Sequence, residues 1–194
     1  GGARGGSVSG DNFTLSGVLP ADKANPILGV SDGGLNYWIA AIRECFEEVG
    51  VLFAIPNRGG MFTETEFAVF ESNERKKLAR GEATFHETLK DAKCSLELEQ
   101  LHYFSRWVTH AGSPRRYDTR FFIARMPQGQ IAQHDGSELI DHRWVKPEDA
   151  LRLNSQGKLN LMFPTQKTLE KLTEFSDVEE ALNYARNAPP ATPM

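Results

Sequence analysis

The chain has few cysteines: only Cys45 and Cys94 among 194 residues. Two are too few for the disulfide framework of a small secreted protein. The sequence also lacks anything resembling a signal peptide or a membrane-spanning run, and its Thr-Pro-Met ending is not a Ser-Lys-Leu peroxisomal address. We therefore expect a cytoplasmic location without a membrane partner.

An excess of positive charge is absent as well. The formal net charge is −4, which argues against broad binding to nucleic acid. Hydrophobic residues make up 40% and charged residues 25%, values ordinary for a globular protein. We expect one domain over residues 1–188, followed by a loose tail at 189–194, with no internal repeat.

The most informative run is Arg-Glu-Cys-Phe-Glu-Glu-Val-Gly-Val at residues 43–51. If this run is helical, Glu44, Glu47 and Glu48 share one face, where their like charges repel. A divalent cation such as Mg²⁺ or Mn²⁺ would turn that repulsion into binding, because both prefer hard oxygen ligands. The alternative is a solvated acidic face, which the flanking Arg43 and Gly50 disfavour.

The pattern around this run predicts a helix from Trp38 to Val49, ended by Gly50 and followed by a strand over Val51–Ile55. Its buried side would carry Trp38, Ile39, Ile42 and either Cys45 or Phe46.

Elsewhere we predict a short strand at 13–15, irregular chain at 20–34, and strands at 98–108, 120–125 and 138–145. A helical insertion at about 61–94 holds two helices. The first is capped by Thr63 with Glu66 and broken by Gly81, and the second covers 84–93. Glu71, Glu74, Arg75 and Lys77 follow the pattern of a solvated helix face. Helices should also start at Pro147 and Pro164 and cover 178–188.

The run at 43–51 resembles R-E-U-x-E-E-x-G-U (U aliphatic), the second half of the box that defines the Nudix hydrolases. Counting back places Gly29 on the box glycine and Leu35 where the box has Glu. In a second alignment, residues 13–22 are similar to the F-x-F-P-G-G-x-x-x-P-x-D segment of a branch with a longer loop. Gly17 is then the functional glycine, and the choice between Gly17 and Gly29 stays open.

That branch contains coenzyme A diphosphatases of animal peroxisomes and their bacterial relatives. The run Pro-Arg-Arg-Tyr-Asp-Thr-Arg-Phe-Phe at 114–122 is similar to its P-R-R-[FY]-D-T-R-F-F strand. The resemblance covers roughly residues 13–170. It implies an α/β fold, with a mixed sheet flanked by helices.

The resemblance also implies the site. Glu44, Glu47 and Glu48 would be metal ligands, and Glu44, Glu47 and Glu138 the candidates for catalysis. The competing interpretation of Glu138 is an exposed acidic residue in a loop. Arg43 would hold the Glu47 carboxylate by a bidentate hydrogen bond four residues on, and direct phosphate binding by Arg43 is the competing interpretation.

Arg115, Arg116 and Arg120 form a basic cluster next to aromatic residues, which suits a nucleotide carrying an extra phosphate. A structural role, with Asp118 tying down Arg116 or Arg120, stays open. None of the five histidines shows metal-ligand spacing.

The resemblance points to Mg²⁺- or Mn²⁺-dependent hydrolysis of the pyrophosphate in coenzyme A or its acyl esters. The alternatives are an ADP-sugar or dinucleotide pyrophosphatase and a non-catalytic nucleotide sensor. The Nudix fold normally opens with one or two strands that are not evident here. Pairing with a second chain as a homodimer, fold-back of residues 11–15, or strands upstream of Gly1 would each repair the sheet, and we expect the third.

Overall fold

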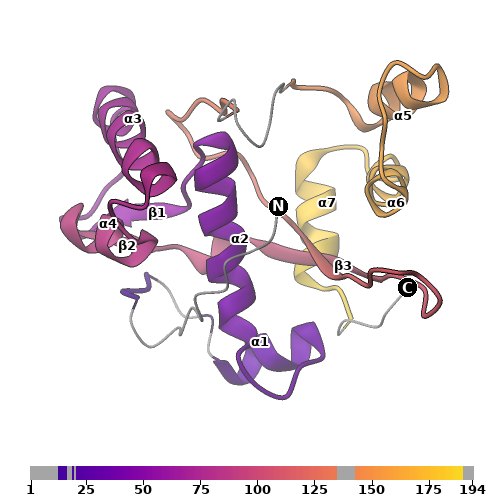
Figure 1. Cartoon of the computed structure of the whole chain (residues 1–194), viewed down its shortest axis with the longest axis horizontal. Coiled ribbons are helices and arrows are strands. Elements are labelled where there is room, and N and C mark those ends of the chain that lie inside the picture. Colours follow the sequence, from indigo (N-terminus) through magenta and orange to yellow (C-terminus); the bar gives the residue numbers. More distant parts are fainter. Residues whose placement is uncertain (1–12, 17–18, 20, 135–142, 190–194) are drawn as a thin grey trace. The chain divides into compact units, whose positions relative to one another are not determined.

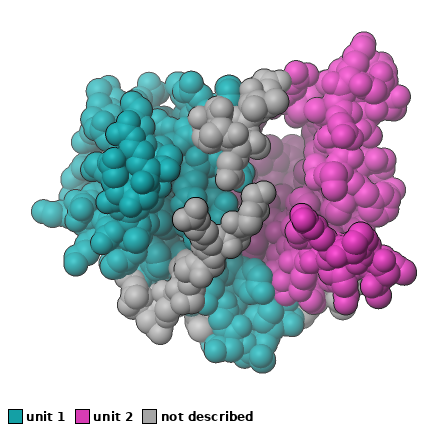
Figure 2. Space-filling view, viewed as in Figure 1, with its two compact units in different colours: residues 1–101, 126–142 teal, residues 102–125, 143–194 magenta. Residues whose placement is uncertain are grey.

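The computed structural model describes residues 13–16, 19, 21–134 and 143–189 (Figure 1). It divides into two compact units (Figure 2): residues 1–101 with 126–142, and residues 102–125 with 143–194. The single domain over residues 1–188 stays a prediction. In the described part of the chain, no helix is long and apolar enough to cross a membrane.

The first unit opens with α1 (Ala21–Leu28) and α2 (Gly34–Val49). The prediction of irregular chain at 20–34 was therefore wrong for α1, which forms despite Pro26 because Ala24 and Leu28 are fully buried. The two helices approach closely at Gly34. A Cβ atom there would lie 2.6 Å from the Asn25 Oδ1, the same oxygen that accepts the Gly34 N–H at 2.7 Å.

The predicted carboxylate helix is confirmed, and so is its buried face. Trp38, Ile39, Ile42 and Phe46 are at most 2% exposed, so Phe46 rather than Cys45 takes the last core position. The Trp38 indole N–H donates to the Leu101 carbonyl at 2.9 Å, which satisfies its polar group inside the core.

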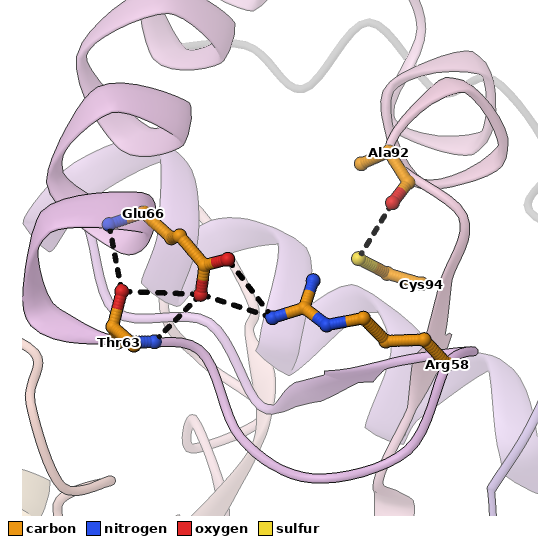
Figure 3. A network of polar contacts seen from close by, with 5 residues as sticks. All are labelled: Arg58, Thr63, Glu66, Ala92 and Cys94. Carbon is orange, nitrogen blue, oxygen red and sulfur yellow. Dashed lines mark hydrogen bonds and ion pairs between the residues drawn. The ribbon is translucent and has the colours of Figure 1, made fainter.

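The predicted insertion helices are α3 (Glu64–Arg80) and α4 (Phe85–Asp91). Both begin with a capping box, Thr63 with Glu66 in α3 and Thr84 with Glu87 in α4. Figure 3 shows the Glu66 carboxylate between Thr63 and Arg58, whose Nη2 donates to both of its oxygens at 3.0 Å. This contact fixes the start of α3.

Aromatic rings join α3 and α4 to α2. The Phe46 ring stacks on Phe70, with centroids 5.6 Å apart, and lies 6.3 Å from Phe85. Since Phe46 and the glutamates occupy different faces of α2, this packing leaves the glutamate face uncovered by these aromatic rings.

The strands of the first unit are short. β1 (Ala54–Pro56) pairs antiparallel with β2 (Cys94–Leu96), and Leu15 forms one parallel bridge to Leu96. The Cys94 thiol donates to the Ala92 carbonyl at 3.3 Å (Figure 3). The strand predicted at 51–55 starts too early, because β1 begins only at Ala54. The Gln130 side chain, rather than a neighbouring strand, bonds both backbone groups of Leu52, at 2.9 and 2.8 Å.

The segment before α1 lies against β2. The Ser16 N–H donates to the Leu96 carbonyl at 2.8 Å, and the Leu96 N–H donates to the Thr14 carbonyl at 2.9 Å. Part of the fold-back arrangement is thus present. Gly17 lies outside the described residues, and strands upstream of Gly1 stay a prediction.

In the second unit, β3 (His102–Val108) pairs antiparallel with β4 (Asp118–Ile123). Three helices follow: α5 (Pro147–Ser155), α6 (Phe163–Leu172) and α7 (Val178–Arg186). Helix α7 packs on β3, where the Tyr184 ring lies 5.9 Å from that of Phe104. All three predicted helices are confirmed.

The predicted strand boundaries were less accurate. Residues 98–100 form a 3₁₀ turn, η2 (Leu98–Gln100), rather than the start of a strand, because the Leu101 N–H bonds back to the Leu98 carbonyl at 3.1 Å. Of the predicted strand at 138–145, residues 138–142 lie outside the described part of the chain. Arg143–Val145 is not a strand, and Trp144 there is 76% exposed.

Candidate metal-binding and substrate-binding residues

The three glutamates lie in the last two turns of α2. Glu44 is exposed, while Glu47 and Glu48 are half-buried. Within the described residues, no three His, Cys, Asp or Glu side chains are gathered closely enough to hold a metal ion. The three carboxylates therefore share a helix face without gathering around one point.

Arg43 contacts two of these carboxylates. Its guanidinium donates to Glu44 Oε1, and its Nε lies 3.6 Å from Glu47 Oε1. The second contact is an ion pair rather than the bidentate hydrogen bond expected from the spacing, since 3.6 Å exceeds hydrogen-bond length. The Arg43 Nε is buried and has no hydrogen-bond partner among the described residues. A small movement of the Glu47 carboxylate would satisfy it.

The donor set fits a hard divalent cation. All three candidate ligands are carboxylates, and Arg43 stands beside two of them to orient their oxygens. Cys45 does not add a soft ligand. Burial, with a smaller contribution from the Glu48 charge, raises the pKa of the Cys45 thiol to about 11, so it stays protonated at neutral pH.

Helix α2 ends at Gly50, whose φ of 70° is left-handed. The Gly50 N–H donates to the Phe46 carbonyl at 3.0 Å. An added Cβ would lie 2.7 Å from Glu71 Oε1 and 2.9 Å from Arg75 Nη1. Glycine is thus favoured here by its left-handed backbone conformation, and any other residue would also displace the ends of the Glu71 and Arg75 side chains.

The interpretation of the α3 charges as a solvated face was wrong for Glu71, Glu74 and Arg75, whose side chains are 21%, 15% and 13% exposed. Glu71 Oε1 accepts from Arg75 Nη1 at 2.5 Å. The Arg75 guanidinium also donates to the carbonyls of Glu47, at 3.2 and 3.3 Å, and Glu48, at 3.1 Å. Sequence reasoning noted these charges but found neither this pair nor the carbonyls, because no local pattern reveals a tertiary partner.

The segment 126–134 also reaches the end of α2. The Gln133 N–H donates to the Val49 carbonyl at 2.9 Å. Glu138 itself lies outside the described residues.

The arginine cluster lies in the second unit. Asp118 accepts a bidentate pair from Arg106, both bonds at 2.8 Å, and lies 3.2 Å from Arg120. The Arg120 side chain is only 3% exposed. Hydrogen bonds from Arg106 and the nearby charge of Arg120 lower the pKa of the Asp118 carboxyl. This is the structural arrangement left open for Arg120, with Arg106 as a partner that the sequence did not reveal.

Arg115 and Arg116 lie in the turn between β3 and β4, and both are exposed. Arg116 Nε donates weakly to the Thr109 carbonyl at 3.4 Å. Among the three predicted substrate-binding arginines, these two present their guanidinium groups to solvent, as a phosphate-binding role requires.

Residues 21–172 match the sequence model of one protein family, the NUDT19 Nudix domain. The chain belongs to this Nudix family. Its match covers most of the chain, including α2 and the β3–β4 hairpin.

This Nudix domain is 25% identical over 195 residues to the acyl-coenzyme A diphosphatase NUDT19 of Xenopus laevis, covering 91% of the chain and 51% of that protein. It is 24% identical over 175 residues to the human protein of the same name, covering 85% and 43%. The chain thus spans about half the length of these relatives.

Among solved structures, a Nudix hydrolase from Alicyclobacillus acidocaldarius has a TM-score of 0.69 and 25% identity. The likeness covers 89% of this chain and 72% of that one. The expected Nudix-like fold is thereby confirmed. The described residues form two antiparallel two-stranded sheets, with one parallel bridge at Leu15, rather than the single mixed sheet that was predicted.

Proposed function

We propose that this Nudix domain is a divalent-metal-dependent diphosphatase acting on coenzyme A or acyl-coenzyme A. The observation that carries the proposal is the intact carboxylate face of α2, in a chain whose named relatives are acyl-coenzyme A diphosphatases. Water would add to one phosphorus while the bridging P–O bond breaks, giving 3′,5′-adenosine bisphosphate and a phosphopantetheine.

Each candidate residue has a separate role in this reaction. Glu44, Glu47 and Glu48 hold the Mg²⁺ or Mn²⁺, which when bound neutralises pyrophosphate charge and acidifies water. Arg43 keeps the Glu47 carboxylate in its binding orientation. Glu44, Glu47 or Glu138 takes the proton of the attacking water.

We assign binding of the 3′-phosphate of coenzyme A, which is not part of the cleaved pyrophosphate, to Arg115 and Arg116. Both side chains are exposed in the turn of the hairpin, and a guanidinium matches phosphate oxygens with a fork of donors. Arg120 would need to leave Asp118 in order to join them.

The test is hydrolysis of coenzyme A and an acyl-coenzyme A with Mg²⁺ or Mn²⁺, with products separated by chromatography and identified by mass. ADP-ribose and a dinucleotide serve as rival substrates in the same assay. Glu47→Gln should abolish turnover, while Glu82→Gln, at an exposed glutamate after α3, should not. Faster cleavage of ADP-ribose would overturn the coenzyme A assignment, and binding without cleavage of any of these would favour a sensor.

A further inference from the structure

Arg75 holds the end of the carboxylate helix from outside it. The guanidinium bonds the carbonyls of two adjacent metal-ligand candidates, Glu47 and Glu48, through Nε and Nη2. Its remaining nitrogen, Nη1, bonds Glu71 one turn earlier on α3. At 13% exposure the side chain is nearly enclosed, so these contacts fix its position.

The end of α2 needs such a partner. The last carbonyls of a helix lack intrahelical donors and carry partial negative charge, so acidic side chains there are unfavourable. Glu44, Glu47 and Glu48 place three of them in the last two turns, and no basic residue lies in the last turn. Arg75 supplies both the missing donors and the missing positive charge.

We infer that Arg75 is a positioning residue: it keeps the last turn of α2 helical so that Glu47 and Glu48 are presented together to a divalent cation. The inference rests on the metal site of the proposed function. It gives α3, part of the helical insertion, a role in the metal site without any contact to metal or substrate.

A simple charge effect predicts the opposite result. A guanidinium beside the carboxylates repels a cation, so removing its charge would tighten metal binding. If Arg75 instead orders the turn, removing it makes the cation reorganise α2 on binding, and affinity falls. The sign of the change therefore separates the two roles.

The experiment measures Mn²⁺ affinity of the full chain from the electron paramagnetic resonance signal of unbound Mn²⁺, beside the half-saturating Mn²⁺ in coenzyme A hydrolysis. Arg75→Met should weaken Mn²⁺ binding about tenfold, equivalent to about 1.4 kcal/mol. Arg75→Lys should recover part of it. Arg80→Met, at a 67% exposed arginine of the same helix, is the matched control and should change nothing.

Thermal unfolding in EDTA shows whether each variant is folded. If Arg75→Met does not fold, Arg75→Lys decides in its place, because it keeps the positive charge but loses the forked contact of Nε and Nη2 with the two carbonyls. That variant should weaken Mn²⁺ binding in the same direction, by a smaller factor.

Unchanged or tighter Mn²⁺ binding by a folded Arg75→Met, or unchanged binding by Arg75→Lys where Arg75→Met does not fold, would overturn the inference and leave the proposed function standing. Mn²⁺ binding by the wild type without cleavage of coenzyme A would overturn the proposed function alone. In that case the Mn²⁺ affinities still decide the role of Arg75. A wild type that binds no Mn²⁺ would overturn both.

Discussion

Replacing one ligand carboxylate should move stability and activity in opposite directions. In Glu48→Gln, an acidic group leaves the C-terminal turn of α2, where the helix dipole disfavours it by about 0.3–1 kcal/mol. Repulsion from Glu44, four residues earlier, falls by a further ~0.2–0.5 kcal/mol. In the absence of metal the variant should therefore be more stable than wild type.

Glu47→Gln should gain less, because Glu47 also loses its ion pair with Arg43. That pair, at 3.6 Å and 37% exposure of the Glu47 side chain, is of the helix-surface kind, worth about 0.3–0.5 kcal/mol. We expect a net gain of roughly 0.5 kcal/mol, or a rise in Tm of about 1–2 °C for a chain of this size.

Saturating Mg²⁺ should reverse the order. A cation at 100 times its Kd stabilises the wild type by about 2.7 kcal/mol, and a variant lacking a ligand receives far less. The assay is thermal unfolding of wild type, Glu47→Gln and Glu48→Gln in EDTA and in excess Mg²⁺, beside turnover at limiting Mg²⁺. The same rank order of Tm in both conditions, or wild-type turnover in the variants, would refute a metal site on this face.

Three further changes probe other parts of the chain. Arg115→Ala should raise KM for coenzyme A about tenfold or more but leave KM for its form lacking the 3′-phosphate unchanged, since a charge-assisted contact is worth roughly 1.5–3 kcal/mol; an equal rise for both substrates would contradict it. Phe46→Ala should cost about 3–5 kcal/mol of unfolding free energy in denaturant titrations, with or without metal, because it empties a fully buried aromatic site. Asp118→Asn should flatten the acid limb of the stability curve. The folded pKa of this carboxyl is lowered, so its contribution is present above the unfolded value near 3.9 and is lost as pH falls below it. Since Asp118 is 41% exposed, the effect should not exceed about 1 kcal/mol, and an unchanged acid limb would contradict it.

The helices other than α1 could be predicted from sequence because their signals are local. Thr63 and Thr84 cap their helices through the glutamate three residues on, and Gly50 and Gly81 end theirs with left-handed backbone. Each signal depends on a few neighbouring residues whose geometry the helix itself fixes.

Long-range partners could not be predicted in the same way. The strand expected at 51–55 is short because Gln130, 78 residues after Leu52, takes both backbone groups. A contact of Asp118 with Arg116 or Arg120 was one open alternative; Asp118 lies beside Arg120 and also binds Arg106 on the facing strand. Such pairings follow from strand register and chain path, which a single sequence does not reveal.

The glutamates of α2 show why Arg75, whose contacts the sequence did not reveal, matters. A helix whose last turn holds two acids and no base contradicts the local rules for helix stability, and such contradictions are expected at functional sites and are compensated elsewhere. Here the compensation comes from three separate segments. Gly50 allows α2 to end with a left-handed residue, Gln133 donates to the Val49 carbonyl, and Arg75 donates to the carbonyls of Glu47 and Glu48. Only the first of these is adjacent in sequence to the acids. The sequence therefore predicts which residues bind the cation, while the residues that hold them in place come from the fold.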